Sequence, residues 1–226
     1  MKKLSLLFTK DGLQWHISKG KTVLEEAFHF VTEETSPHLV EEKLDDVLKF
    51  DDYKEIEVIS ALNHFSLTPD SFTEHELGYK LISYNAPVDE ANEELMLSVN
   101  KKFAVQFYYT FPKHFYQKIK AKKLPTKFNF SGEKFLNALT VKNHKEIHIN
   151  LYHHQVEFFA FENKKVALYN NLDADSEVDF LYFIMFSLSK INFGTAETHF
   201  HIYGETHENE TFISELRKFV KNIKVH

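Results

Sequence analysis

The sequence EIHINLYHHQVEFFAFENKKVALYNNL at residues 146–172 sets the pattern on which the fold of this chain depends. It holds three short runs rich in β-branched and aromatic residues, separated by turn-like breaks, as is typical of strands joined by hairpins. The apolar helical stretch DSEVDFLYFIMFSLSKI follows at 175–191, and ETHFHIYGE at 197–205 adds one more strand that closes on a lone glycine. The expected order is therefore βββαβ.

The beginning of the chain repeats this order. Strands are expected at residues 4–9, 13–18, 22–31 and 55–62. Between the first two lies Asp11-Gly12, a strong hairpin signal because glycine tolerates the positive φ that such turns demand. Between the last two, a helix opens at Ser36 with Pro37 at its first position. Its buried face is predicted to carry Val40, Leu44, Val47 and Leu48, which recur at helical spacing.

Two such units predict an α/β fold with a mixed sheet in each half, because the strand after each helix must cross over to join the sheet. Helices then pack against each sheet. The segment 85–92 contains Pro87 and few apolar residues, so the boundary between the halves is expected there. The predicted domains are an N-terminal half at 1–88 and a C-terminal half at 89–226.

Composition restricts the class of protein. With 226 residues, of which 43% are hydrophobic and 27% charged, the chain fits a soluble globular protein with a substantial core. A net charge of −6 argues against general affinity for nucleic acid or anionic lipid. The longest apolar run, residues 180–186, is far shorter than the ~20 residues that span a bilayer. No cysteine is present, which suits a reducing compartment, so a cytoplasmic location is expected.

Three motifs carry a resemblance to a known family. They are Leu-Thr-Pro-Asp-Ser-Phe at 67–72, Phe-Leu-Tyr-Phe-Ile-Met at 180–185, and His-Ile-Tyr-Gly at 201–204. With these motifs and its doubled βββαβ order, the chain resembles the duplicated ribonuclease H-like, actin-like ATPase fold. In particular, it resembles a family of short uncharacterised bacterial actin-like proteins, mainly from Bacteroidetes, that carries a domain-of-unknown-function label. The resemblance covers most of the chain.

The resemblance implies a site for ATP and Mg²⁺, made in actin-like ATPases by two glycine-rich hairpin turns that are each led by an aspartate. Small residues are needed in these turns because backbone N–H groups must approach the phosphates closely. In this chain Phe8-Thr9 stands where the first acid belongs. Asp11-Gly12 comes later, in the turn itself, and reads equally well as a plain hairpin turn.

The other positions of such a site match no better. The second turn, at 150–154, has bulky side chains and no glycine. Where a glycine pair contacts adenosine in the family, Gly204 is followed by Glu205. The vestigial cofactor-binding candidates are Asp11, Gly12, Asn150 and Gly204, and no catalytic residue is expected. We expect a non-enzymatic actin-like scaffold or protein-binding module without a cofactor; the alternative is a nucleotide-binding actin-like ATPase with divergent phosphate loops that uses ATP and Mg²⁺.

Histidines and carboxylates are the side chains of this chain that could bind a metal ion, because it has no cysteine. His199 and His201 are two residues apart and share one face of the expected strand, and His207 could reach back as a third ligand. No carboxylate or cysteine obviously completes this set, so no metal site is expected, and we interpret the 14 histidines as unpatterned residues of a polar surface; a zinc site on these three is the alternative. Glu55 and Glu57 share a strand face, and we interpret them as an edge-facing polar pair rather than as nuclease carboxylates.

The helix at 178–191 is apolar on nearly every side, which is typical of a helix that is buried all round, here between the two halves. The alternative is that part of its surface binds a partner or a second copy. The 23 Phe and 10 Tyr favour some aromatic surface at an interface. The expected partner is a protein of unknown identity, with a homodimer as one candidate arrangement.

Overall fold

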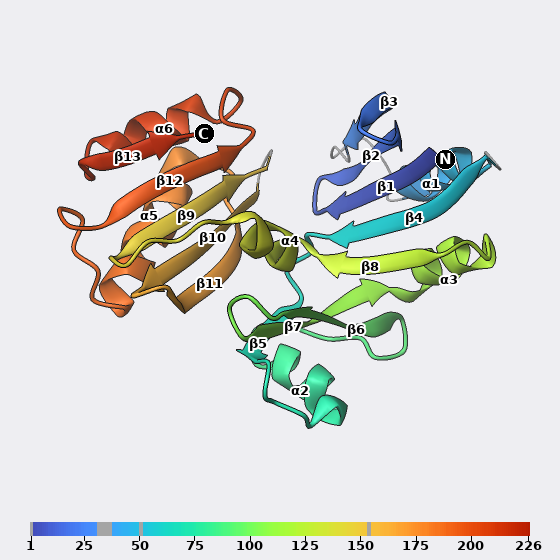
Figure 1. The fold of residues 1–226 in the computed structure, drawn as a ribbon, viewed down its shortest axis with the longest axis horizontal. Coiled ribbons are helices and arrows are strands. Elements are labelled where there is room, and N and C mark those ends of the chain that lie inside the picture. The colour runs from blue at the N-terminus through green and yellow to red at the C-terminus, as the bar shows by residue number, and fades with distance from the viewer. Residues whose placement is uncertain (1, 31–37, 50–51, 153–154) are drawn as a thin grey trace. The chain divides into compact units, whose positions relative to one another are not determined.

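The computed structural model describes residues 2–30, 38–49, 52–152 and 155–226 (Figure 1). The chain forms two compact units, Met1–Lys134 and Phe135–His226, and their boundary falls within helix α4 (Ser131–Ala138). The helix start expected at Ser36 and Pro37 lies outside the described residues. Within the described residues, no helix is long and apolar enough to cross a membrane.

The first unit joins strands that are far apart in the sequence. Its elements before α4 are β1 (Lys2–Thr9), β2 (Gly12–Lys19), β3 (Thr22–Phe30), α1 (His38–Leu48), β4 (Tyr53–Ser60), β5 (Phe65–Pro69), η1 (His75–Leu77), α2 (Gly78–Ser83), β6 (Glu93–Asn100), β7 (Val105–Pro112), α3 (Lys113–Ala121) and β8 (Thr126–Phe130). Among the described residues, one mixed sheet has the order β3-β2-β1-β4-β8 and an antiparallel sheet has the order β5-β7-β6. The pairing of Thr9 with Gly12 confirms the predicted first hairpin.

Helix α1 packs against one face of the mixed sheet. Its buried residues are Val40, Leu44, Val47 and Leu48, which confirms the face predicted from helical spacing. They form one apolar cluster with alternate strand residues, such as Leu4, Leu6 and Phe8 of β1. Because successive side chains of a strand point to opposite faces, the intervening residues of β1 lie on the other face of the sheet.

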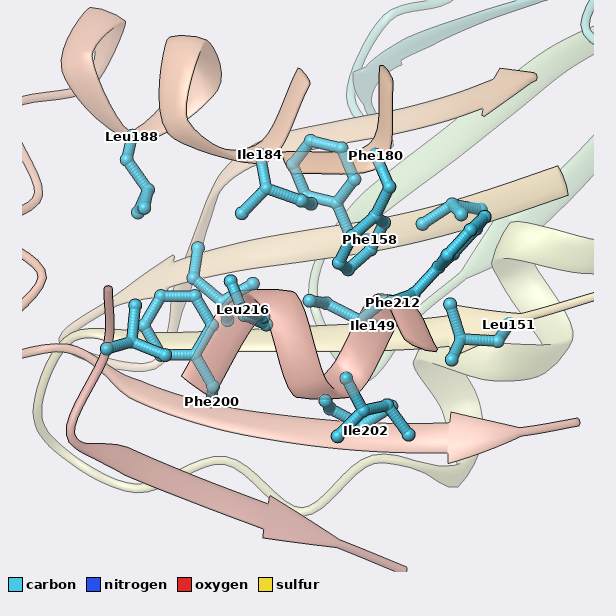
Figure 2. Packing of buried hydrophobic residues seen from close by; sticks show 14 of the residues in the cluster. Ile149, Leu151, Phe158, Phe180, Ile184, Leu188, Phe200, Ile202, Phe212 and Leu216 are labelled. Atoms are coloured by element: carbon cyan, nitrogen blue, oxygen red, sulfur yellow. The ribbon is translucent and has the colours of Figure 1, made fainter. Parts of the chain in front are cut away.

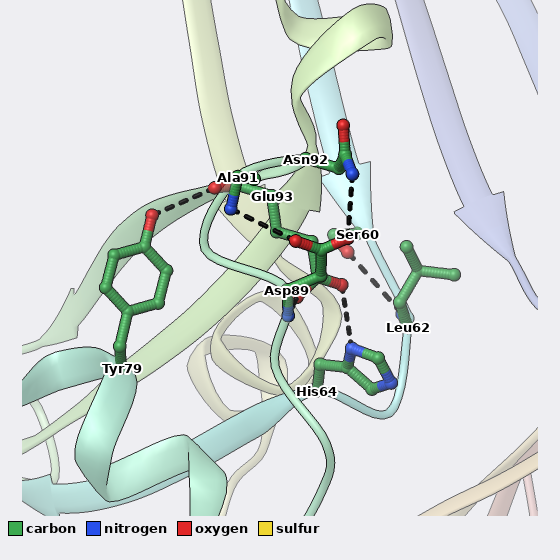
Figure 3. A network of polar contacts seen from close by, with 8 residues as sticks. All are labelled: Ser60, Leu62, His64, Tyr79, Asp89, Ala91, Asn92 and Glu93. Carbon is green, nitrogen blue, oxygen red and sulfur yellow. Dashed lines mark hydrogen bonds and ion pairs between the residues drawn. The ribbon is translucent and has the colours of Figure 1, made fainter.

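The loop before β6 is held in the first unit by a polar network around Glu93 (Figure 3). Glu93 Oε1 lies 2.9 Å from His64 Nδ1, and Glu93 Oε2 accepts a hydrogen bond from the backbone N–H of Asp89 at 3.1 Å. Tyr79 Oη donates to the carbonyl oxygen of Glu93 at 2.9 Å. The boundary expected between residues 88 and 89 therefore lies inside the first unit. Polar contacts hold this loop in the first unit, so the scarcity of apolar residues at 85–92 did not mark a boundary between the two units.

The second unit repeats the strand order of the first mixed sheet. Its elements after α4 are β9 (Glu146–Leu151), β10 (Gln155–Glu162), β11 (Lys165–Asp173), α5 (Glu177–Lys190), β12 (His199–Gly204), α6 (Glu210–Arg217) and β13 (Asn222–Val225). The sheet order β11-β10-β9-β12-β13 corresponds to β3-β2-β1-β4-β8 position by position. In both sheets the strand after the helix pairs in parallel with the first strand. The predicted α/β fold with two βββαβ halves is confirmed.

Helices α5 and α6 cover one face of the second unit's sheet (Figure 2). The apolar cluster beneath them includes Ile149, Leu151, Phe158, Phe180, Ile184, Phe200, Ile202, Phe212 and Leu216. The rings of Phe180 and Phe212, one from each helix, stack with their centroids 5.1 Å apart. Since the residues of β9, β10 and β12 in this cluster face the helices, their alternates lie on the opposite face of the sheet, where polar residues such as Glu146, His148 and Glu157 occur together with Phe159 and Phe161.

Within the second unit, helix α5 is buried on one side only, whereas a helix buried all round was expected. Its buried residues are Phe180, Ile184 and Leu188. Its exposed apolar residues are Val178, Tyr182 and Phe186, whose exposed fractions are 75%, 60% and 46%. The sheet and α6 pack against the buried residues of α5. The exposed apolar residues remain accessible in the described part of the chain.

Candidate functional site

The turn between β1 and β2 forms as predicted, but its surroundings are apolar. Gly12 has a φ of +141°, and the backbone N–H of Asp11 donates to Thr9 Oγ1 at 3.2 Å. A hollow of about 240 Å³ beside the turn is lined by Phe8, Thr9, Lys10, Gly12, Val40, Leu62, Pro112 and Phe115. Of these described lining residues, Lys10 alone carries a charge. The hollow therefore offers few polar partners to a phosphate.

Asn150 and Gly204 lie side by side in the second unit. Gly204 has a φ of +84°, and a Cβ placed on it would lie 2.2 Å from the carbonyl oxygen of Leu151 and 2.6 Å from Asn150 Oδ1. Glycine is thus required here because two backbones approach closely. Of the four cofactor-binding candidates, the structure brings these two together in one unit, whereas Asp11 and Gly12 belong to the other unit.

The side-chain amide of Asn150 is bound to a buried carboxylate. Asn150 Nδ2 donates to Glu157 Oε1 at 2.9 Å. Glu157 is fully buried and also accepts hydrogen bonds from Tyr152 Oη at 2.7 Å and Tyr169 Oη at 3.0 Å. A phosphate at this point would meet a carboxylate and tyrosines, whereas phosphate-binding turns offer backbone N–H groups. The tip of the turn, residues 153–154, lies outside the described residues.

The three histidine candidates lie at different places in the second unit. His201 of β12 joins a group of metal-ligand side chains whose other members come from β9. His199 lies at the amino end of β12, and its ring centroid is 4.3 Å from that of His144. His207 is exposed and follows the carboxyl end of β12. Among the described residues, His201 alone of the three belongs to that group.

The group consists of Glu146, His148 and His201, with one ligand atom from each lying within 4.8 Å of the others. Glu146 is 1% exposed. One of its oxygens, Oε2, accepts a hydrogen bond from the backbone N–H of Lys142 at 3.0 Å and lies 3.2 Å from His148 Nε2. The other, Oε1, lies 2.9 Å from His144 Nε2 and 3.8 Å from His201 Nε2. A buried carboxylate therefore faces several imidazoles.

Burial controls the protonation of this group. It lowers the pKa of His201 to about 4, with a further contribution from the neighbouring His148. It also lowers the pKa of His148, although Glu146 opposes this effect. Burial raises the pKa of Glu146, but the Lys142 backbone N–H and His148 outweigh it, so the pKa is lowered overall. At neutral pH the group thus combines a carboxylate with neutral imidazoles.

Glu146 and His148 were not among the candidates predicted from the sequence. They supply the carboxylate and the second imidazole that the histidine set lacked. The signal that could have found them is a Glu-x-His pattern in one strand beside a His-x-His pattern in another. In the parallel register of β9 and β12, His199 pairs with Glu146 and His201 pairs with His148.

Another buried carboxylate, Glu57 of β4, lies in the first unit. Its Oε1 accepts hydrogen bonds from Lys134 Nζ at 2.7 Å and Asn129 Nδ2 at 3.1 Å, and its Oε2 lies 2.6 Å from Lys3 Nζ. The interpretation of Glu55 and Glu57 as an edge-facing pair is wrong, because β4 pairs with strands on both sides. Burial raises the pKa of Glu57, but the hydrogen bonds from Lys134 and Lys3 lower it to about 2. A carboxylate neutralised by two lysines is poorly suited to nuclease metal ions.

Known proteins with similar sequence or structure share this architecture. The family model described as "Protein of unknown function (DUF3822)" matches residues 1–223. No curated protein matches the chain. A crystal structure from Bacteroides thetaiotaomicron VPI-5482, of a protein with actin-like ATPase fold and unknown function, has a TM-score of 0.83 at 21% identity, over 100% of this chain and 90% of that one. The chain has the actin-like ATPase fold, which confirms the fold predicted from its sequence.

Two other structures share the fold at lower similarity. The PilM-PilN type IV pilus biogenesis complex has a TM-score of 0.60 at 9% identity, over 99% of this chain and 88% of that one. The cytoplasmic domain of EpsL, an inner membrane component of the type II secretion system of Vibrio cholerae, has a TM-score of 0.54 at 7% identity, over 100% and 86% of the two chains. At these identities the likeness concerns the fold alone.

Proposed function

The chain belongs to the DUF3822 family of proteins of unknown function, and on that premise we propose that it is a non-catalytic actin-like scaffold that assembles through helix α5. One observation carries the proposal: in the second unit, the residues at the positions where actin-like ATPases bind phosphate make contacts that stabilise the fold. Asn150 is bound to the buried Glu157, and Gly204 is packed against the backbone of Leu151. The protein keeps the actin-like architecture without its nucleotide chemistry, as a fold does not dictate a function.

Two structural neighbours support an assembly role. PilM-PilN is a type IV pilus biogenesis complex, and EpsL is a component of the type II secretion system. In both cases a protein with this fold works as part of a larger protein assembly. A scaffold role for this chain is in keeping with that use of the fold.

An apolar stripe on α5 is the surface that serves assembly. Val178, Tyr182 and Phe186 follow one another at four-residue spacing, so they lie along one side of the helix, and all are exposed. The rings of Tyr182 and Phe186 stack with their centroids 5.7 Å apart. A groove of about 570 Å³ beside the stripe is lined by Glu177, Val178, Leu181, Tyr182, Met185 and Glu215. Contiguous exposed apolar surface of this kind marks interaction sites.

A second copy of the chain is the partner that fits this stripe. Helix α5 carries Glu177 and Asp179 in its first turn and Lys190 in its last turn. When two α5 helices pack antiparallel about a two-fold axis, the acidic turn of each lies against Lys190 of the other, and the apolar stripes meet between them. The same patch is then buried on both copies.

Replacing Tyr182 with glutamate is expected to convert a dimer into a monomer, because a charge at the centre of the apolar interface would be buried without a partner. Light scattering after size exclusion should give about twice 26.7 kDa for the native chain and 26.7 kDa for Tyr182→Glu. Circular dichroism of the variant checks that the fold is retained.

Tyr84→Glu is the matched control, because Tyr84 is a 72% exposed tyrosine that belongs to the first unit and is not part of α5. This variant should remain dimeric. Lys190→Glu should weaken the dimer, since it sets like charges against each other. A native chain that stays at 26.7 kDa at high concentration would overturn the assembly proposal.

The second candidate function is nucleotide binding by an ATPase with divergent phosphate loops. It is favoured by the turn at Asp11 and Gly12, which is retained at the carboxyl end of β1 beside a hollow of about 240 Å³. Binding of Mg-ATP distinguishes this function from the scaffold, because the scaffold has no use for a nucleotide.

A further inference from the structure

The register of two parallel strands brings three ligand side chains together. Glu146 and His148 are two residues apart on β9, so they point to the same face of the sheet. His201 of β12 is paired with His148, and their rings stack with centroids 4.6 Å apart and an interplanar angle of 10°. His148 Nε2 lies 3.2 Å from Glu146 Oε2, and His201 Nε2 lies 3.8 Å from Glu146 Oε1. Both imidazoles thus direct the same ring nitrogen at one carboxylate.

These separations match a metal site. Zn²⁺ binds His nitrogen and carboxylate oxygen at about 2.0–2.2 Å, so neighbouring ligand atoms of a tetrahedral site are about 3.3 Å apart. His148 Nε2 lies 3.2 Å from one oxygen of Glu146 and His201 Nε2 lies 3.8 Å from the other, and these two separations bracket that value. One ligand atom from each of the three residues lies within 4.8 Å of the others, so the side chains are close enough to converge on one ion.

The other ring nitrogen of each histidine is also held. His148 Nδ1 lies 3.2 Å from Tyr203 Oη, and His201 Nδ1 lies 3.0 Å from His226 Nε2. With a proton on Nδ1, each ring donates to its partner and directs the lone pair of Nε2 towards Glu146. Metal-binding histidines are typically oriented in this way by a second hydrogen bond.

The surroundings leave a path to the group. Glu146 and His148 are each 1% exposed, whereas the side chain of His201 is 18% exposed. His201 lines a cavity of about 420 Å³ together with His144 and His199. His144 Nε2 lies 2.9 Å from Glu146 Oε1, so His144 contacts the carboxylate from the side of this cavity, although it does not belong to the group of three.

We propose that Glu146, His148 and His201 bind one divalent transition-metal ion of the Zn²⁺ class. Imidazole and carboxylate ligands suit Zn²⁺, whereas Mg²⁺ and Ca²⁺ prefer ligand sets made of oxygen atoms. The site is independent of the scaffold function and of any nucleotide. The proposed ligand set differs from the candidates named from the sequence, since His201 is kept, His199 and His207 are left out, and Glu146 supplies the carboxylate.

Calorimetric titration of the full chain with ZnCl₂, after removal of metal by a chelator, tests the site. The native chain should bind one Zn²⁺ per chain, with a matching rise in melting temperature. His201→Gln and Glu146→Gln should each weaken binding by about 100-fold or more, because each removes a ligand. Tyr203→Phe should weaken it by about 10–100-fold, because it removes only the hydroxyl that orients His148.

His207→Gln is the matched control, because His207 is an exposed histidine outside the group, and this variant should bind Zn²⁺ like the native chain. Mg²⁺ should give no binding. Since Glu146 is buried and its substitution can impair folding, His201→Gln provides the decisive comparison. Absence of stoichiometric Zn²⁺ binding would show that Glu146 is only a structural carboxylate, and binding that survives His201→Gln unchanged would place the metal on surface histidines. Either result overturns the proposal.

Discussion

Gly204→Ala is expected to lower the free energy of unfolding of the second unit by about 3 kcal/mol. Gly204 has a φ of +84°, a conformation that costs an L-residue with a side chain about 1–2 kcal/mol. The added Cβ would also lie 2.2 Å from the carbonyl oxygen of Leu151, which belongs to the backbone of the neighbouring strand. Relief of that clash requires β9 and β12 to separate at their carboxyl ends, where they pair.

Gly20→Ala is the control that separates these two effects. Gly20 also has a positive φ, of +62°, but no atom lies within 4 Å of the position of its Cβ. Its substitution should therefore cost about 1 kcal/mol. Hydrogen exchange of amides in the strands next to each glycine measures both costs within their own units. Equal costs at Gly204 and Gly20 would contradict the close backbone approach at Gly204.

Glu57→Gln is expected to lower the free energy of unfolding of the first unit by about 2 kcal/mol at neutral pH. The carboxylate is 12% exposed and is paired with Lys3 and Lys134, whose side chains are 36% and 44% exposed. Loss of the charge leaves two partly buried lysines without their anion. Partial hydration of these lysines keeps the cost below that of breaking a fully buried pair.

The pH dependence of this effect has a defined sign. The pKa of Glu57 is lowered to about 2 in the folded chain, against about 4.3 for an unperturbed glutamate. The ion pair therefore stabilises the fold fully above about pH 4.3, and the stabilisation is lost as the pH falls towards 2. Urea unfolding at pH 7 and near pH 2, followed by the fluorescence of Trp15 in the first unit, should show the difference between Glu57→Gln and the native chain shrinking at low pH.

Glu55→Gln is the matched control for Glu57, because Glu55 is an exposed glutamate of the same strand. Its substitution should change the free energy of unfolding by less than about 0.5 kcal/mol. An effect of Glu57→Gln as small as that of Glu55→Gln, or one that does not vary with pH, would contradict the ion-pair assignment.

Local patterns in the sequence were sufficient to predict the repeated βββαβ order. Alternating apolar residues mark the strands, the Asp11-Gly12 turn marks a hairpin, and the residues from Val40 to Leu48 mark a helix face, and all these signals act over a few residues. The pairing that completes the first mixed sheet could not be predicted, for the opposite reason. β8 pairs with β4 although Phe130 and Ser60 are 70 positions apart in the chain, and a pairing over that distance is set by tertiary packing.

The candidate site residues show the same difference between patterns within one strand and contacts between strands. His201 could be named as a candidate ligand because it shares a strand face with His199, which is a property of spacing within one strand. Glu146 and His148 were missed because their position beside His201 depends on the register of two strands joined through a helix. The partner of Glu57 was missed in the same way, since Lys134 lies 77 residues away in the chain.

The buried side of helix α5 could not be predicted for a different reason. Its composition is apolar on nearly all sides, and apolar composition alone does not say which side the rest of the protein covers. The structure buries Phe180, Ile184 and Leu188 and leaves Tyr182 and Phe186 exposed. The resulting stripe is a property of the arrangement of α5 on its sheet.

Calorimetric titration with Mg-ATP shows whether this actin-like fold binds a nucleotide, or whether Asn150 and Gly204 only stabilise the fold through Glu157 and Leu151. We expect no heat of binding with Mg-ATP up to about 1 mM, which corresponds to a binding free energy weaker than about −4 kcal/mol, and no rise in melting temperature. If the native chain binds Mg-ATP with micromolar affinity and the Asp11→Ala variant does not, the expectation is wrong and the chain is a nucleotide-binding protein.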